Sequence, residues 1–231
     1  MEDIRNVNTG TIRLGGSHYL NAYILPDILT GFLKEYPNIQ VELVEDSSAV
    51  LSRMLADRQL DLTFNCNPRF MMDFERYPAF QDNMLLAVPE RFPINGTISG
   101  GLTAREVAAG CHLLPEHPAV SLTAFQHTDF LLLNAGNNLH DRAMELFREA
   151  GFHPMVRLEL AQLVTAYRLA AAGLGATFIS DRLVNETEDQ LLYYKLDPRQ
   201  SKRTFYMLLP NRRYTSAAVR RFIEYFEVAI G

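Results

Sequence analysis

Hydrophobic residues recur along the first third of the chain with spacings that alternate between those of strands and those of helices. Residues 11–15, 40–46 and 60–64 are short segments in which apolar residues alternate with polar ones, as is typical of strands. Between them lie two segments whose apolar residues recur every three or four positions, as on one face of a helix. The order strand, helix, strand, helix, strand predicts parallel strands joined by right-handed crossovers.

Local signals mark where these helices begin. Ser17 precedes the first helical region, and Ser47 or Ser48 precedes the second, where a hydroxyl oxygen can accept a hydrogen bond from the backbone. Pro26 lies inside the first region and predicts either a kink or a short helix followed by a longer one. The first region is therefore not expected to be one straight helix.

The same order of elements returns in the second half of the chain. Its strand patterns are residues 130–133, 155–160 and 176–180. Asn137 or Asn138 caps the first helix between them. The glycines of the turn 173–175 follow a helix, and the partial negative charge of a helix C-terminus repels phosphate. This turn is therefore interpreted as structural, and not as a nucleotide-binding loop.

The remaining segments connect the two blocks and follow the second one. Residues 83–90 predict a strand that leads into residues 91–101, which are rich in Pro and Gly and carry the chain from one block to the other. Thr103 and Glu106 then predict a capping box at the start of a short helix. Two more strand patterns and an amphipathic helix follow the second block, and we assign them back to the first. The prediction is an α/β protein of two lobes with a hinge of two crossover segments and a cleft between the lobes. Lobe I comprises residues 10–88 and 204–231, lobe II comprises residues 89–203, and residues 1–9 are a residual linker.

Composition restricts the classes of function. The chain is 48% hydrophobic and 21% charged, as in folded globular proteins. Its formal charge of -5, from 22 Lys and Arg against 27 Asp and Glu, argues against a nucleic-acid surface within this segment. The chain contains neither a bilayer-spanning apolar run nor a secretory signal, and its two cysteines cannot form a disulfide framework. We therefore expect a cytoplasmic protein that does not contact membranes.

The sequence offers little catalytic or metal chemistry. None of the six histidines lies in an HExxH pattern, so we expect no metal and no cofactor. Residues 15–19 begin like the nucleophile elbow of a hydrolase, but Tyr19 replaces the second glycine, and we expect no enzyme. Cys66 follows a strand and is either a redox-sensing thiol or an ordinary buried one. His18 either contacts an anionic ligand or is a solvated residue at a helix start.

Three segments in this order are similar to one family. Residues 10–46, 55–64 and 169–180 resemble the effector-binding domain of LysR-type transcriptional regulators. The matching features are Gly10, Gly15, Leu25-Pro26, Phe32, Tyr36-Pro37, Leu60-Asp61 and the Gly173-Leu174-Gly175 turn. The resemblance runs from about Gly10 to the final helix and implies a type 2 periplasmic-binding-protein-like fold.

The resemblance also implies a function and partners. Family members carry a winged helix-turn-helix before this domain, and the few residues before Gly10 do not contain one. We therefore interpret the chain as an isolated regulatory domain that senses a small molecule, with DNA contacted only through the missing N-terminal domain. Family members pair through a helix of each lobe, so we expect a homodimer, with a tetramer as an alternative in the intact protein.

The ligand is expected where the carboxyl ends of strands meet helix N-termini, because free backbone N–H groups there favour an anion such as a carboxylate. The resemblance places ligand contacts on Ser17, Tyr19, Ser48, Asn137, Asn138 and Leu139. The neighbouring strand ends add His18, Ser47, Asn65, Cys66 and Gln162 as further candidates. Each polar residue among them has a plain alternative as a helix cap.

Two other functions remain as alternatives. A solute-binding protein of a transporter would use the same fold and the same cleft, but it would carry a signal peptide or a lipid-anchoring cysteine. An enzyme on this scaffold would need an acid–base pair, and the candidate residues are hydroxyls and amides. A helix-turn-helix encoded upstream of Met1 would separate a regulator from both.

Overall fold

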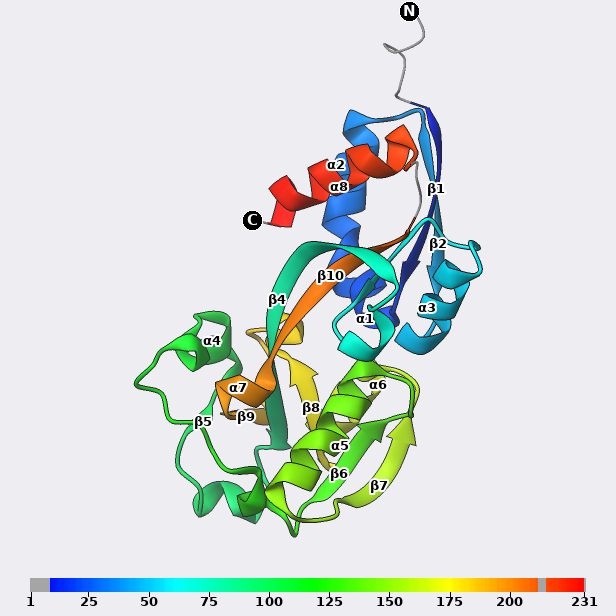
Figure 1. The fold of residues 1–231 in the computed structure, drawn as a ribbon. Helices are drawn as coiled ribbons and strands as arrows, with labels where there is room; N and C mark the ends of the chain where they lie inside the picture. Colours follow the sequence, from blue (N-terminus) through cyan, green and yellow to red (C-terminus); the bar gives the residue numbers. More distant parts are fainter. Residues whose placement is uncertain (1–8, 212–214, 231) are drawn as a thin grey trace, which may run out of the picture. The chain divides into compact units, whose positions relative to one another are not determined.

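The computed structural model describes residues 9–211 and 215–230. These residues form two compact units (Figure 1): unit 1 contains the residues up to Gln81 and from Thr204 onward, and unit 2 contains Asp82–Arg203. The chain thus passes between the units twice, and the first passage lies upstream of the predicted boundary at residues 88 and 89. The residual linker predicted at residues 1–9 lies, apart from Thr9, outside the described residues.

Unit 1 contains a sheet with the strand order β2-β1-β3-β10. β1 (Gly10–Gly16) pairs in parallel with β2 (Ile39–Glu45) and with β3 (Leu62–Asn65). β10 (Lys202–Pro210) pairs antiparallel with β3. The parallel pairing predicted for the first three strands is confirmed.

The helices of unit 1 are α1 (His18–Tyr23), α2 (Leu25–Glu35), α3 (Ser48–Ala56) and α8 (Ala217–Ile230). Pro26 lies in the first turn of α2, where its missing N–H has no partner to lose. The prediction of a short helix followed by a longer one is therefore confirmed. α8 packs on α2, with the rings of Phe32 and Phe222 edge to face at 5.2 Å. A short 3-10 turn, η1 (Pro68–Phe70), follows β3.

Unit 2 repeats the parallel arrangement. β6 (Asp129–Leu133) pairs in parallel with β7 (Met155–Leu160) and with β8 (Ala176–Ser180), as β1 does with its neighbours. β4 (Phe74–Pro89) pairs antiparallel with β8 and with β9 (Leu191–Lys195), and β9 pairs with β5 (Gly101–Leu102). The second predicted block therefore has the strand order of the first.

The helices of unit 2 are α4 (Ala104–Ala108), α5 (Asn138–Ala150), α6 (Leu163–Ala171) and α7 (Pro198–Ser201). Its 3-10 turns are η2 (Pro93–Gly96), η3 (Cys111–Leu113), η4 (Leu122–Phe125) and η5 (Asp181–Leu183). The Thr103 hydroxyl accepts from the Glu106 N–H at 3.3 Å, and the Glu106 carboxylate accepts from the Thr103 N–H at 2.8 Å. The predicted capping box is confirmed.

The glycine turn after α6 is structural, as predicted. Gly173 has φ 84°, a left-handed conformation that favours glycine, and the Leu174 N–H donates back to the Leu169 carbonyl at 3.0 Å. The Arg91 guanidinium donates to the carbonyls of Ala172 and Gly173, at 2.7 and 3.2 Å. The helix C-terminus therefore binds a cation of the protein itself, consistent with its partial negative charge.

β4 begins with a polar segment that contains a proline. β4 is longer than the strand expected to begin at Asn83, because the polar, proline-containing residues 74–82 also adopt strand conformation. Arg76 and Pro78 are tolerated there because both side chains are exposed.

No helix within residues 9–211 and 215–230 is long and apolar enough to cross a membrane.

Candidate functional site

The junction between β1 and α1 leaves a helix start uncapped. Ser17 is the N-cap residue of α1 in extended conformation (φ -66°, ψ 160°), and its carbonyl accepts from the Asn21 N–H at 2.9 Å. Among the described residues, its hydroxyl makes no capping hydrogen bond to the helix. The Ser17 hydroxyl is therefore not used as a cap of α1.

Gly16 fixes the course of this junction. A Cβ atom on Gly16 would lie 1.9 Å from the side-chain oxygen of Asn21. The Asn21 side-chain amide in turn donates to the Gly16 carbonyl at 3.1 Å. Only glycine permits this close approach of the helix to the strand end, which holds Ser17 at the edge of the sheet.

The next two predicted residues differ in their surroundings. His18 is partly exposed, and its Nδ1 lies 3.2 Å from the Glu45 carboxylate at the end of β2. Tyr19 is buried, and its ring lies against Tyr23 and Phe205. His18 is therefore accessible at the sheet edge, whereas the ring of Tyr19 belongs to the packing of unit 1.

The junction between β2 and α3 is closed by its own residues. The Ser47 hydroxyl accepts from the Val50 N–H at 3.4 Å, and the Asp46 carboxylate accepts from the Ser47 N–H at 2.7 Å. Ser48 is buried in the first turn of α3. The predicted cap at Ser47 is confirmed, so at this helix part of the hydrogen-bonding capacity is already used.

The end of β3 carries a buried amide. Asn65 is fully buried, donates to the Ser52 hydroxyl at 3.0 Å and accepts from the Asn67 N–H at 2.9 Å. Cys66 follows it as a partly exposed cysteine that takes part in no disulfide among the described residues. These bonds of Asn65 hold the end of β3 against α3. Cys66 is more accessible than Asn65.

The register of the sheet brings these three strand ends together. Gly16 is paired with Glu45, and Gly15 is paired with Thr63, so the carboxyl ends of β1, β2 and β3 meet at one edge of unit 1. Ser17 and His18, Ser47 and Ser48, and Asn65 and Cys66 follow these ends. Glu45 and Asp46 were not predicted as ligand contacts. The only sequence feature that marks them is their position at the end of a strand beside Ser47.

In unit 2, the junction between β6 and α5 is capped. The Asn137 side-chain oxygen accepts from the Leu139 N–H at 2.9 Å, which confirms the cap predicted there. Asn138 and Leu139 are buried in the first turn of α5. Of the three residues predicted at this turn, only Asn137 is partly exposed.

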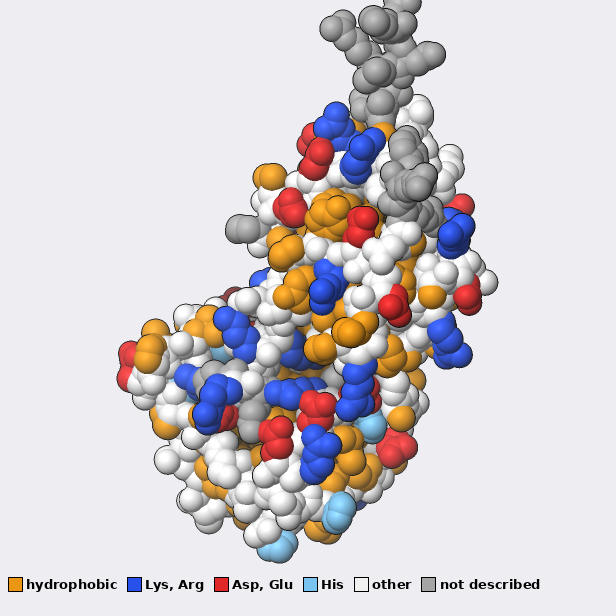
Figure 2. Space-filling view, viewed as in Figure 1, with side chains coloured by type: hydrophobic (Ala, Val, Ile, Leu, Met, Phe, Trp, Pro, Cys, Tyr) orange, Lys and Arg blue, Asp and Glu red, His pale blue; other side chains and the backbone are white. Residues whose placement is uncertain are grey.

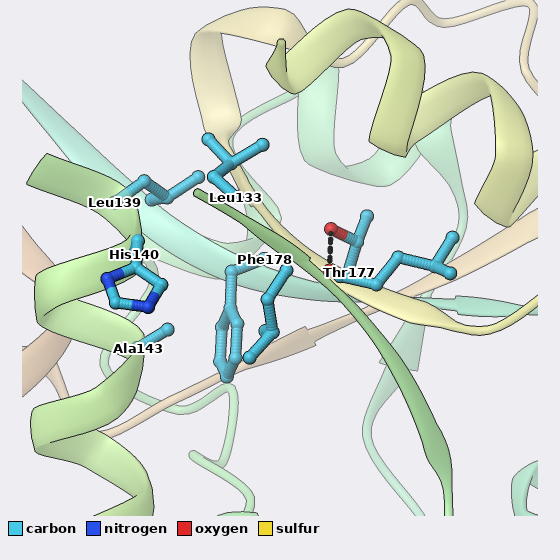
Figure 3. A pocket seen from close by; sticks show the side chains of 8 residues that line it. Leu133, Leu139, His140, Ala143, Thr177 and Phe178 are labelled. Carbon is cyan, nitrogen blue, oxygen red and sulfur yellow. Dashed lines mark hydrogen bonds between the residues drawn. The ribbon is translucent and has the colours of Figure 1, made fainter. Parts of the chain in front are cut away.

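A small cavity lies below this turn (Figure 3). Side chains of β6, β8 and α5 line it, among them Leu133, Leu139, His140 and Phe178. The Thr177 hydroxyl donates to the Leu131 carbonyl at 2.9 Å, so it is already used. The space that the centre of a water molecule can occupy is about 10 Å³, which admits roughly one water. The cavity is too small to be the effector site.

The second junction of unit 2 resembles that at Ser17. Gln162 is the N-cap residue of α6, is exposed and, within the described chain, makes no side-chain hydrogen bond to the helix. Leu133 pairs with Leu160, so the ends of β6 and β7 lie together at one edge of unit 2. Asn137 and Gln162 therefore follow neighbouring strand ends, as Ser17 and Ser47 do in unit 1.

A buried acid–base pair follows the carboxyl end of β8. His112 Nε2 lies 3.0 Å from the Asp181 carboxylate, and the two side chains are only 5% and 11% exposed. Burial opposes the ionisation of Asp181, but hydrogen bonds from His112 and from the backbone and side chain of Asn83 outweigh it and lower its pKa. The pair is therefore largely shielded from solvent, unlike His18 and Glu45 in unit 1. Across the part of the chain that the structure describes, no cluster of side chains could hold a metal ion.

Surface charge agrees with a small ligand better than with nucleic acid. Figure 2 shows basic and acidic side chains interspersed over the visible face of the molecule. A nucleic-acid surface would instead gather Lys and Arg side chains on one face. The polar strand ends of each unit thus remain candidates for ligand binding.

Comparison with known proteins identifies a family. The sequence profile described as the LysR substrate binding domain matches residues 5–229. The uncharacterized HTH-type transcriptional regulator YcgK of Bacillus subtilis (strain 168) is 26% identical over 205 residues, which cover 87% of this chain and 61% of YcgK. The chain thus spans less than two thirds of the length of this relative.

Solved structures share the fold. The regulatory domain of CcmR from Synechocystis PCC6803, in complex with 2-PG, has a TM-score of 0.80 at 19% identity over 96% of this chain and 98% of that domain. The effector binding domain of BenM with its effector benzoate has a TM-score of 0.72 at 20% identity over 95% of this chain and 91% of that domain. The fold is therefore that of such effector-binding domains, which is type 2 periplasmic-binding-protein-like.

Proposed function

The chain belongs to the LysR substrate-binding domain family, and on this basis we infer that it is the effector-sensing part of a transcriptional regulator. It binds a small metabolite and thereby alters DNA binding by the helix-turn-helix part of the intact regulator. The observation that carries this proposal is the family match over residues 5–229. Because the family is non-enzymatic, the ligand is recognised without being converted.

The site that we propose lies in a cleft, where a ligand contacts the polar strand ends of both units. In unit 1 these contacts come from Ser17 and His18, and in unit 2 from Asn137 and Gln162. The support is that Ser17 and Gln162 are accessible N-cap residues whose side chains form no cap within the described helices. Their side chains can bind a ligand without first breaking a bond of the fold.

We propose an anionic ligand, such as a carboxylate. The uncapped starts of α1 and α6 present backbone N–H groups, and the helix dipole adds partial positive charge there. BenM, one of the structural relatives, binds the carboxylate benzoate. Asp46 lies beside the α3 start and repels an anion, so we expect the carboxylate of the ligand away from α3.

Signalling follows from binding both units at once. A ligand that contacts two parts of a protein stabilises whichever arrangement of these parts it fits better. We therefore propose that effector binding shifts the population of arrangements of the two units. The intact regulator then transmits this shift to its DNA-binding part.

A thermal-shift screen of the purified domain against aromatic and aliphatic carboxylates tests this function. We expect at least one compound to raise the melting temperature, because ligand that binds only the folded state stabilises it by mass action. For that compound, Ser17→Ala and Gln162→Ala should each raise Kd about tenfold or more, the cost of losing one hydrogen bond to a charged group.

Thr103→Ala is the matched control, because it removes a helix cap in unit 2 that is remote from the strand ends. This variant should melt earlier but keep the same ligand-induced rise and the same Kd. A compound whose affinity is unchanged in both site variants would show that the effector binds elsewhere.

We also propose that the domain forms a homodimer. The edge strands β2 and β7 and the neighbouring α2 expose large apolar side chains, which monomers usually cover or avoid. These residues are Leu33, Leu43, Met155, Val156 and Leu158. Sedimentation of the wild-type domain should give a dimer, and Leu43→Glu with Val156→Glu should give a monomer. A wild-type monomer at high concentration would contradict this proposal.

A further inference from the structure

The chain passes between the units on two neighbouring strands. β4 carries it from Gln81 to Asp82, and β10 carries it back from Arg203 to Thr204. β4 and β10 are hydrogen-bonded neighbours. The two passages therefore form one two-stranded ribbon rather than two separate linkers.

Side chains join the two strands at three successive steps. The rings of Phe80 and Phe205 stack at 4.6 Å with an interplanar angle of 10°. At the next step the Gln81 amide donates to the Thr204 hydroxyl at 3.4 Å. One step further, Arg203 Nε donates to the Asp82 carboxylate at 2.8 Å, and Arg203 Nη2 donates to its second oxygen. Each step forward on β4 matches a step back on β10, as between antiparallel strands.

The last of these contacts is a buried ion pair. Asp82 is 1% exposed and Arg203 is 8% exposed. Removing two charges from water is costly, and apolar residues of similar volume often stabilise a fold equally well. The bidentate guanidinium–carboxylate geometry adds what apolar packing lacks, because two parallel hydrogen bonds fix both the distance and the angle between the groups. The pair thus defines one register of the two strands.

We propose that the Asp82–Arg203 pair is a hinge clamp. It fixes β4 to β10 where the chain passes between the units, so the two strands bend together and resist sliding or separating. The clamp therefore limits the arrangements that the two units sample. The population shift caused by the effector is then a change between a small number of arrangements. This inference rests on the proposed function, because that shift is what the clamp would control.

Distance measurements between spin labels on the two units test the clamp without any ligand. Labels are attached at Lys34→Cys in unit 1 and Arg148→Cys in unit 2, both exposed helix positions, after Cys66→Ser and Cys111→Ser have removed the native thiols. We expect a narrow distance distribution with the pair intact. Asp82→Asn should broaden it, because the neutral amide no longer fixes the Arg203 fork.

Asp82→Asn leaves a buried unpaired charge and can prevent folding. The double variant Asp82→Leu with Arg203→Met removes both charges, and it should keep a melting temperature close to that of the wild type while broadening the distribution. Asp129→Asn is the matched control: it breaks an exposed ion pair with Arg157 inside unit 2 and should leave the distribution narrow. A folded double variant with a distribution as narrow as the wild type would overturn the clamp.

Hydrogen exchange of the wild-type domain decides the matter even if both Asp82 variants fail to fold. The clamp predicts that amides of residues 80–82 and 203–205 exchange more slowly than the rest of β4 and β10. Fast exchange at these residues would overturn it. Failure of the proposed function has a different signature: no carboxylate raises the melting temperature, while the ligand-free distances and exchange rates are unaffected.

Discussion

The two units bury different kinds of polar groups. The buried polar residues described in unit 1 are Ser48, Ser52, Thr63 and Asn65, all of them neutral. Unit 2 buries the ionisable residues Asp82, His112 and Arg203 as well as neutral ones. Neutral hydrogen bonds do not change between acid and neutral pH, whereas buried ion pairs require particular protonation states. We therefore expect the stability of unit 2 to depend more strongly on pH than that of unit 1.

The largest effect is expected from the apolar core of unit 1. Phe222 is fully buried and contacts Phe32 and Phe226. Phe222→Ala should lower the free energy of unfolding by about 3–5 kcal/mol, because it leaves a cavity. Urea unfolding at pH 7 and pH 5 should give the same loss at both values. If the loss of unfolding free energy caused by Phe222→Ala depended on pH, the proposed difference in pH dependence between the two units would be wrong.

A smaller, pH-dependent effect is expected at Asp181 in unit 2. Because the folded pKa of Asp181 lies below its unfolded value, its ionisation stabilises the fold above about pH 4. This contribution is lost as the pH falls through the folded pKa. Asp181→Asn should therefore cost about 1.5–3 kcal/mol at pH 7, the value of hydrogen bonds to a charged group, and progressively less below pH 4.

Calorimetric melting curves of the wild type and Asp181→Asn between pH 7 and pH 3 check this prediction. The two melting temperatures should converge at the acid end. Asp129→Asn serves as the control, because its exposed ion pair contributes little at any pH. Parallel curves for Asp181→Asn would show that the buried carboxylate contributes no pH dependence.

The smallest effects distinguish two helix starts within unit 1. Ser47→Ala removes a hydroxyl that accepts a hydrogen bond from α3 and should cost about 0.5–1 kcal/mol. Ser17→Ala removes a hydroxyl that caps nothing in the described part of α1 and should cost less than about 0.5 kcal/mol. Equal losses in urea unfolding would mean that Ser17 is a structural cap and not a residue kept for a ligand.

Local signals in the sequence were sufficient for the repeated blocks. Apolar spacing predicted β1, β2 and β3 and their counterparts β6, β7 and β8, because one buried face is encoded residue by residue. Caps at Ser47, Thr103 and Asn137 were predicted for the same reason, since a cap binds within its own helix turn. The whole arrangement of two parallel blocks follows from such short-range patterns.

Long-range pairs could not be predicted in this way. Asp82 and Arg203 are 121 residues apart, and His112 and Asp181 are 69 apart. No periodicity links such positions, because their contact depends on the register of strands that must first pair. Local spacing does not reveal the direction of a side chain either: the ring of Tyr19, a predicted ligand contact, packs against Phe205.

If polar strand ends of both units bind one effector, the bound ligand must protect backbone amides in both. Hydrogen exchange of the domain is measured with and without a carboxylate that raises its melting temperature. We expect the ligand to slow exchange in both units, at residues 16–21 and 45–50 of unit 1 and at residues 134–139 and 161–164 of unit 2. Protection confined to one unit, or to segments away from these strand ends, would contradict it.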